Sequence, residues 1–275
     1  MKKFDFIIIL SAPRSGSTFL KQLLLKNFRL CYFSNKDEKI FNRERKLKFT
    51  NSSRYKISLS NNFGKTYKST DPTEGSSFLK YWFGKQINLL KIKKKPQYKH
   101  FCQSLEFLKN ECKYPFIFKN PWILERIPLF QLQSKKILFI NLKRDLLDAC
   151  YSTLISKYST QSKPTNDISY KPSSINYSKY KLLEEKIIAY QKGYIQQIDK
   201  IVKNKIKISI SYESLLTNQL NEIQKFSRKL ELHKNSFFIN KKKFISYSSS
   251  FKNDIFFSRK KNKLKLLIKN DRNFK

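Results

Sequence analysis

The chain has 275 residues, which suits one large domain, and its 40% hydrophobic and 15% aromatic residues supply a packed core, which excludes wholesale disorder. The formal net charge of +38 favours an anionic partner, but the lysines are scattered rather than blocked, so a general compositional bias is the favoured explanation. Four cysteines without a C-x-x-C pair and two histidines argue against a zinc site or a disulfide framework, and reduced thiols predict a cytoplasmic protein.

The amino-terminal segment has some features of a secretory signal, because Lys2 and Lys3 precede a short apolar run. Asp5 interrupts that run, its uninterrupted part is only Phe6–Leu10, and Arg14 follows soon after. No other segment approaches the ~18 apolar residues that a membrane span needs. We therefore predict a soluble protein without a membrane span.

Buried strands and amphipathic helices alternate along the chain. Phe4–Leu10 is a continuous apolar run, as expected for a parallel strand covered on both faces, and the apolar residues after Thr18 have helical spacing. The further predicted elements are strands at 116–119, 137–142 and 206–212, and helices at 122–132, from 145 to about 157, at 180–203 and at 218–230. This order predicts an α/β fold of three layers, a P-loop-like fold with a central parallel sheet flanked by helices.

Two stretches interrupt this order within what we expect to be a single domain over residues 1–275. Residues 31–100 are polar, basic and aromatic with weak periodicity, and residues 158–178 are rich in Ser, Pro and Asn. Long loops inside a compact domain are usually lids or ligand-binding segments, or are simply mobile. We therefore predict substrate-side or mobile insertions at both places.

The first strand runs into Ser11–Thr18, which aligns with the phosphate-loop template G-x-x-x-x-G-K-[ST]. Gly16 supplies backbone freedom, and the amides of residues 15–18 lead into a helix N-terminus, which binds anions. The first glycine and the lysine of the template are missing; Ser17 stands in the lysine's place, and Arg14 lies three residues earlier. No strand ends in the Asp that holds magnesium in nucleoside triphosphatases, so Arg14 is expected to grip a phosphate and neutralise a leaving oxygen instead.

A second basic position follows the strand at 137–142. Arg144 lies at its carboxyl end, and Ser152 comes eight residues later, about two helical turns on. Ligands of open parallel sheets bind outside the carboxyl ends of the strands, so Arg14 and Arg144 are expected to face one crevice. Two separate basic positions at one crevice suggest a nucleotide with phosphates at both ends of its ribose. The alternative is a solvated Arg144 beside Asp145 as a helix cap.

Four segments resemble the PAPS-dependent sulfotransferases, where PAPS is 3′-phosphoadenosine 5′-phosphosulfate. "SAPRSGSTFL" resembles their 5′-phosphosulfate loop, "FKNPWILERIPLF" their K-x-P segment, "RDLLDACYS" their 3′-phosphate motif and "ISYESLLTN" their Y-E-D-L segment, in the family's order over residues 4–232. The resemblance implies PAPS as co-substrate and no metal. The implied contacts are Arg14, Ser15, Gly16, Ser17, Thr18 and Phe19 with the 5′-phosphosulfate, Arg144 and Ser152 with the 3′-phosphate, and Tyr212 with the adenine.

The chain also departs from the cytosolic sulfotransferases, and the arginine-type loop is closer to the protein-tyrosine and bacterial ones. The C-terminal R-K-G-x-x-G-D loop is absent, with 259–260 as a vestige, and the catalytic histidine of a K-T-H context has no counterpart. In the related types a glutamate shortly after the first helix is the base; Glu38 is the nearest match, and Glu74, beside an aromatic cluster, is its rival. Either can instead be a solvated surface carboxylate. Lys119, from the K-x-P segment, is expected to assist at the leaving oxygen.

The implied reaction moves a sulfuryl group from PAPS to a hydroxyl or amine of an unidentified glycan, phenol or small metabolite. The aromatic segment 75–85 and residues 158–178 are candidates to line the acceptor side, and the basic surface mildly favours an anionic glycan. Two other classes stay open. A P-loop nucleotide-binding, kinase-like protein would need ATP and a magnesium-binding Asp, and a basic nucleic-acid-binding protein would show a steep salt dependence. No specific nucleic acid is expected.

Overall fold

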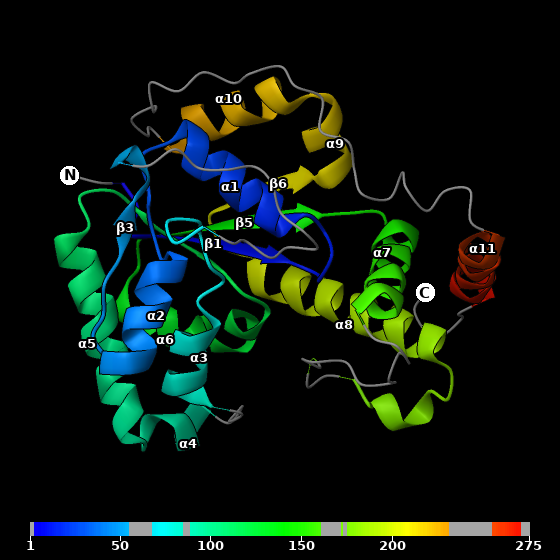
Figure 1. Ribbon diagram of the computed structural model, residues 1–275, viewed down its shortest axis with the longest axis horizontal. Helices are drawn as coiled ribbons and strands as arrows, with labels where there is room; N and C mark the ends of the chain where they lie inside the picture. Colours follow the sequence, from blue (N-terminus) through cyan, green and yellow to red (C-terminus); the bar gives the residue numbers. More distant parts are fainter. Residues whose placement is uncertain are drawn as a thin grey trace.

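A six-stranded sheet runs through the middle of the molecule, and helices cover both of its faces (Figure 1). The strands are β1 (Phe6–Ser11), β2 (Cys31–Tyr32), β3 (Thr50–Asn51), β4 (Phe116–Lys119), β5 (Ile137–Lys143) and β6 (Lys207–Ser211). Their order is β3-β2-β4-β1-β5-β6, and all neighbours are parallel except β2 with β3. This computed structural model describes residues 3–54, 68–84, 89–160, 172, 175–230 and 255–270. The predicted three-layer α/β fold is confirmed, with one antiparallel strand at the edge.

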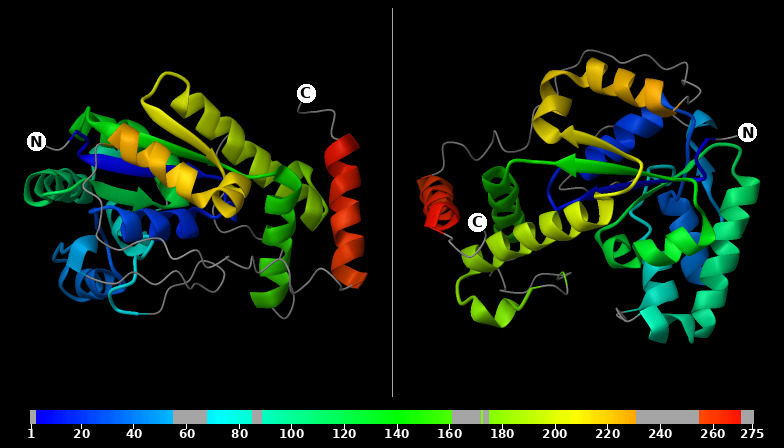
Figure 2. Two further views of the ribbon diagram at one scale, coloured as in Figure 1. Left: turned by 90° about the horizontal axis from the view of Figure 1, so that it is seen from above. Right: turned by 180° about the vertical axis from the view of Figure 1, so that it is seen from behind.

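Helices and short 3₁₀ turns connect the strands. The helices of the described ranges are α1 (Ser17–Asn27), α2 (Asn35–Glu44), α3 (Ser76–Phe83), α4 (Leu89–Lys93), α5 (Pro96–Glu111), α6 (Ile127–Gln133), α7 (Leu146–Thr160), α8 (Leu183–Val202), α9 (Tyr212–Thr217), α10 (Gln219–Leu230) and α11 (Ile255–Asn270). The 3₁₀ turns lie at Ser52–Arg54, Pro121–Arg126 and Tyr177–Lys179. α1 and α10 cover one face of the sheet, and α8 crosses the other (Figures 1 and 2).

β1 is buried on both faces, which explains its continuous apolar sequence. Ile8 pairs with Phe118 of β4 on one side and with Phe139 of β5 on the other. Side chains alternate along a strand, so the even-numbered residues of β1 join the core with α3, α5 and α8, whereas Ile7 and Ile9 join the core with α1 and α10. The helix layers on both faces are therefore anchored on the same strand.

A third, smaller apolar core joins α7, α8 and α11 at one end of the molecule (Figure 2). Leu264 of α11 is buried in it. Lys260, which the sequence suggested as a remnant of the R-K-G loop, contacts Glu184 Oε1 of α8 with its Nζ at 2.6 Å. Lys261 Nζ lies 3.2 Å from Asp148 Oδ1 of α7. These ion pairs hold α11 against both helices.

Most predicted boundaries agree with the structure to within three residues, and the strand at 116–119 agrees fully. The continuous helix predicted at 122–132 is wrong, because a 3₁₀ helix occupies Pro121–Arg126 and α6 begins only at Ile127. Pro128 lies in the first turn of α6. Proline has no amide proton and its ring clashes with the preceding turn, so an α-helix cannot continue through this position.

The described parts of residues 31–100 are mostly regular structure, namely β2, β3 and helices α2 to α5. Phe78, Trp82 and Phe83 of α3 are buried in the core, so these rings of the segment expected on the acceptor side pack inside the protein. Residues 55–67 and 85–88, and residues 161–171, 173 and 174 of the second predicted insertion, lie outside the described residues. Within the described ranges, no helix has the length and apolar character needed to cross a membrane.

Candidate active site

The carboxyl ends of β1, β4 and β5 meet at one edge of the sheet, because the three strands are parallel neighbours. β1 ends at Ser11, β4 at Lys119 and β5 at Lys143. The loops that carry Arg14 and Arg144 therefore leave the sheet from the same edge, as the sequence predicted.

The phosphate loop joins β1 to α1 through a left-handed backbone. Gly16 is the N-cap of α1 with φ 83°, and Arg14 has φ 64°, a conformation that costs a side-chain-bearing residue roughly 1 kcal/mol. A Cβ atom at position 16 would lie 2.2 Å from Cδ2 of the Tyr212 ring, so only glycine fits there. The first turn of α1 contains no acidic residue, which leaves its N-terminus positive and suited to an anion.

Arg144, which directly follows β5, contacts the backbone of this loop. Its Nη1 donates a hydrogen bond of 2.6 Å to the backbone oxygen of Arg14, although the two residues are 130 positions apart in sequence. The Arg144 guanidinium carbon lies 4.5 Å from the centroid of the Tyr212 ring, within the range of a cation–π contact. Arg144, which the sequence placed at the same crevice as Arg14, thus contacts the backbone of Arg14 and the ring of Tyr212. The Asp145 side chain also caps α7, since its Oδ1 accepts from the backbone N–H of Asp148 at 2.9 Å.

The electrostatics of the loop favour an anionic ligand. Burial, and after it the positive charge of Arg144, lowers the pKa of Arg14, while Tyr212 and Glu74 act in the opposite direction. An anion placed between the two guanidinium groups would relieve both penalties. Two arginines, a helix N-terminus and a glycine therefore form a donor set that fits a phosphate-bearing nucleotide.

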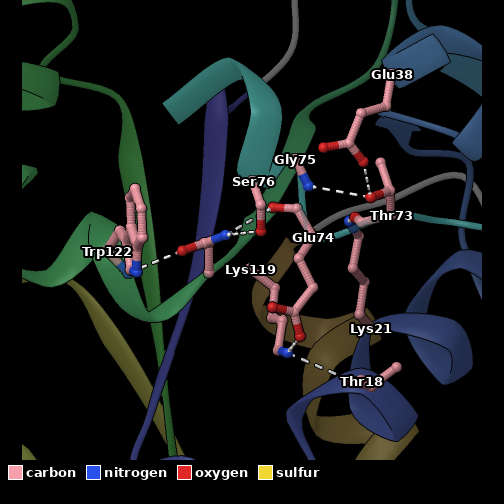
Figure 3. Close-up of polar contacts among 10 residues, drawn as sticks. Thr18, Lys21, Glu38, Thr73, Glu74, Gly75, Ser76, Lys119 and Trp122 are labelled. Atoms are coloured by element: carbon pink, nitrogen blue, oxygen red, sulfur yellow. Dashed lines mark hydrogen bonds and ion pairs between the residues drawn. The ribbon is translucent and has the colours of Figure 1, made fainter. Parts of the chain in front are cut away.

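A carboxylate–lysine pair lies next to α1 (Figure 3). Lys119, at the end of β4, forms an ion pair with Oε1 of Glu74 and lies 3.2 Å from Oγ1 of Thr18, to which its Nζ donates. The Lys119 side chain is only 10% exposed, whereas that of Glu74 is 37% exposed. The buried Lys119 therefore fixes the Glu74 carboxylate by an ion pair, and Glu74 remains accessible to a molecule that approaches from solvent.

Glu38 has a different role from Glu74 (Figure 3). Its Oε2 accepts a hydrogen bond from the Thr73 hydroxyl, and its Oε1 accepts from the backbone N–H of Ser77 at 2.7 Å. Ser77 lies in the first turn of α3, where backbone N–H groups have no partner within the helix. Glu38 of α2 thus caps α3 and holds the segment that carries Glu74.

Two further side chains fix the Glu74 segment, and the sequence did not single them out. Lys21, one turn into α1, donates from Nζ to the backbone oxygen of Thr73 at 2.6 Å. Asn120 donates from Nδ2 to the Glu74 backbone oxygen at 3.3 Å and to Ser76 Oγ at 3.0 Å. A lysine within the apolar stripe of a helix was a signal that could have found Lys21, whereas nothing in the sequence pattern marks the role of Asn120.

Burial strongly affects Lys21, which is 4% exposed. Burial first and the nearby Lys119 second lower its pKa from 10.5 to about 7, while Glu74 and Glu38 partly oppose the change. The Lys21 ammonium group is therefore expected to titrate near neutral pH. Such a lysine is unfavourable for stability, and its place beside a carboxylate–lysine pair is typical of a functional site.

The remaining predicted site residues lie in the loop, in α1 and on α7. Ser15 and Ser17 are buried, and Phe19 is buried in the core with β1, so Phe19 can serve a ligand only through its backbone. Ser152 is half-buried on α7, two turns after Arg144. The described part of the chain contains no group of three or more His, Cys, Asp or Glu side chains able to hold a metal; the predicted independence from metal stays a prediction.

The comparisons with known proteins agree with this geometry. The model of the sulfotransferase family matches residues 6–235, so the chain belongs to the sulfotransferase family. The sulfotransferase STF1 from Mycobacterium tuberculosis H37Rv is similar, with a TM-score of 0.53 at 11% identity over 84% of this chain and 68% of that one. STF9 from Mycobacterium avium gives 0.53 at 10% identity over 85% and 65%. These identities show a shared fold alone, and no curated protein sequence matches the chain.

Proposed function

We propose that the protein is a PAPS-dependent sulfotransferase that transfers a sulfuryl group to a hydroxyl or amine of its acceptor. The observation that carries this proposal is the hydrogen bond from Arg144 to the backbone of Arg14, which joins two cations at one phosphate loop. Family membership supports the sulfuryl chemistry. The second cation supports a donor with phosphates on both ends of its ribose.

Each residue has a proposed part in binding the donor. Arg14, Ser17 and Thr18 bind the 5′-phosphosulfate together with the N-terminus of α1, and Ser15 and Gly16 contribute their backbone amides. Arg144 and Ser152 bind the 3′-phosphate, and the Tyr212 ring lies against the adenine. PAPS supplies an activated sulfuryl group to this site, and the chain's own residues orient it.

Glu74 is the proposed base. The acceptor oxygen or nitrogen forms a bond to sulfur, the bond from sulfur to the bridging phosphate oxygen breaks, and that oxygen keeps the electron pair. Glu74 takes the proton from the acceptor, while Lys119 and Arg14 stabilise the negative charge on the leaving phosphate. We prefer Glu74 to Glu38 because Glu38 uses both of its oxygens to cap α3 and to hold Thr73.

Calorimetric titration with adenosine 3′,5′-bisphosphate tests the donor site. Binding without magnesium is expected, and Arg144→Ala should weaken it at least about tenfold, because a charged hydrogen bond to phosphate is lost. Lys143→Ala, which removes the neighbouring exposed charge, is the matched control. Magnesium-dependent binding of ATP alone would favour a kinase-like, nucleotide-binding protein. Salt-sensitive binding of RNA or DNA alone would favour a nucleic-acid-binding protein.

A transfer assay with PAPS tests the base and the acceptor class. Acidic glycans, neutral glycans and phenols are the acceptors to compare, with an anionic glycan expected to react best. Glu74→Gln should lower kcat by about 100-fold or more and leave the affinity for the bisphosphate unchanged. If Glu38→Gln has this effect instead, at unchanged stability, Glu38 is the base.

A further inference from the structure

Gln191 is a buried glutamine that contacts two different elements around the proposed donor site. It lies on α8, and its side chain is completely buried. Its Nε2 donates to the backbone oxygen of Pro13 at 2.9 Å and to Oγ1 of Thr153 on α7, also at 2.9 Å. Both amide protons of Gln191 are therefore used, one on the phosphate loop and one on α7.

The chemistry of the partners determines how this amide is oriented. The backbone oxygen of Pro13 can only accept, so the amide nitrogen of Gln191 must face it. The Thr153 hydroxyl gives its own proton to the backbone oxygen of Ala149 at 2.8 Å, so it accepts from Gln191. The result is one continuous hydrogen-bonded chain from the phosphate loop, through Gln191, to the backbone of α7.

The two ends of this chain of hydrogen bonds lie next to residues proposed to bind the 5′-phosphosulfate and the 3′-phosphate. Pro13 immediately precedes Arg14 in the loop, and Thr153 immediately follows Ser152 on α7. A loop with a left-handed Arg14 needs contacts that hold it, and the carbonyl groups of Pro13 and Arg14 are held by Gln191 and Arg144 respectively. Gln191 is thus placed to set the separation between the loop and α7.

Stability alone is a poor explanation of a glutamine at this position. Oε1 of Gln191 is buried and has no hydrogen-bond partner among the described residues. A buried acceptor without a donor is destabilising, and this cost offsets part of what the hydrogen bonds to Pro13 and Thr153 contribute to stability. The arrangement is therefore better explained by what Gln191 does for its two neighbours.

We propose that Gln191 is a positioning residue that sets the distance between the 5′-phosphate and 3′-phosphate subsites of the donor site. The inference rests on the proposed function, because it assumes that Arg14 and Ser152 bind opposite ends of one nucleotide. A ligand that engages both subsites gains from their fixed separation, since its second contact forms without further ordering of the protein. A ligand with one phosphate gains nothing from that separation.

Binding of three nucleotides tests this proposal: adenosine 3′,5′-bisphosphate, adenosine 5′-monophosphate and adenosine 3′-monophosphate. In Gln191→Met the affinity for the bisphosphate should fall roughly tenfold, as expected for loss of a hydrogen bond on each side. Affinities for the two monophosphates should change by less than about twofold. Gln196→Met, at an exposed position of α8, is the matched control and should leave all three affinities unchanged.

Thr153→Val supplies a second variant that breaks the α7 end of the chain only. It should weaken binding of the bisphosphate but not of the monophosphates. The double variant with Gln191→Met should lose less binding free energy than the sum of the two single variants, because both changes break the same chain of hydrogen bonds. This pair keeps the test available if one variant folds poorly.

The outcomes separate the two proposals. If wild type prefers the bisphosphate strongly and Gln191→Met keeps that preference, the role of Gln191 is refuted and the donor site stands. An equal loss of affinity for all three nucleotides also refutes the role of Gln191, because a general structural defect weakens the binding of every ligand. If wild type binds the bisphosphate no more tightly than the monophosphates, the donor site itself fails, and the role of Gln191 fails with it.

Discussion

Replacement of Lys21 by methionine should change how the stability of the protein depends on pH. The pKa of Lys21 is lowered from 10.5 to about 7 by burial and by Lys119. Between these values the unfolded chain holds a proton that the folded protein has released. The shift therefore costs stability below about pH 7, where the buried amine must carry a proton, and this cost disappears as the pH rises to about 10.5.

The magnitude follows from the linkage relation. Within this window wild type gains up to about 1.4 kcal/mol of stability per pH unit from Lys21, and Lys21→Met gains nothing. From pH 7.5 to 9.5 the difference in unfolding free energy should therefore move by about 2 to 3 kcal/mol in favour of wild type. At pH 6.5 the variant should be at least as stable as wild type, because removal of the buried cation offsets the lost hydrogen bond to Thr73, worth about 1 kcal/mol.

Urea unfolding followed by tryptophan fluorescence at pH 6.5, 8.0 and 9.5 measures this difference. All other lysines titrate in both proteins, so they cancel in the comparison. Lys26→Met, on the last turn of the same helix, shows what the loss of one positive charge does by itself. Parallel stability curves for wild type and Lys21→Met over this range would refute the reasoning, since they would mean that Lys21 keeps its proton in the folded protein.

Three further substitutions test other parts of the site and the fold. Gly16→Ala should abolish binding of adenosine 3′,5′-bisphosphate and destabilise the protein by about 1 to 3 kcal/mol, because its Cβ would lie 2.2 Å from the Tyr212 ring; an unchanged melting temperature would contradict this. Glu38→Ala should cost about 1 to 2 kcal/mol in urea unfolding through loss of the α3 cap and leave bisphosphate affinity intact. Burial alone would raise the pKa of Glu184, but hydrogen bonding and charge from Lys260 lower the pKa below 4.5. The stabilising effect of the Glu184 carboxylate is therefore present above that pH and is lost on acidification. Glu184→Gln should show a shallower loss of stability between pH 5 and 3, and a slope equal to that of wild type would contradict the ion pair.

Local patterns were sufficient to predict the elements that surround the donor site. β1 and β5 are continuous apolar runs because both of their faces are covered, and that burial is visible in the sequence itself. The helix after the loop was visible from the spacing of its leucines. Arg14 and Arg144 could be paired in advance because parallel strands bring their carboxyl ends to one edge.

The elements of residues 31–100 were harder to predict, for reasons that differ from one to the next. β2 and β3 have two residues each, which is too short for any periodic signal. α3 begins at Ser76 after Gly75, and the cap that stabilises it comes from Glu38, 39 residues before Ser77. α5 did carry a readable signal, since Phe101, Leu105 and Leu108 form an apolar stripe after Pro96.

The sequence by itself determined the strand, the phosphate loop and the helix after it, the two arginines, and the pair of glutamates among which the base was sought. Only the tertiary structure decided which glutamate caps α3 and which meets Lys119, and only it revealed Lys21 and Gln191. The physical reason is that a strand or a helix is recorded in the spacing of neighbouring residues, whereas these contacts join residues 39 to 178 positions apart. Their geometry depends on how the helices pack against the sheet, which no local pattern contains.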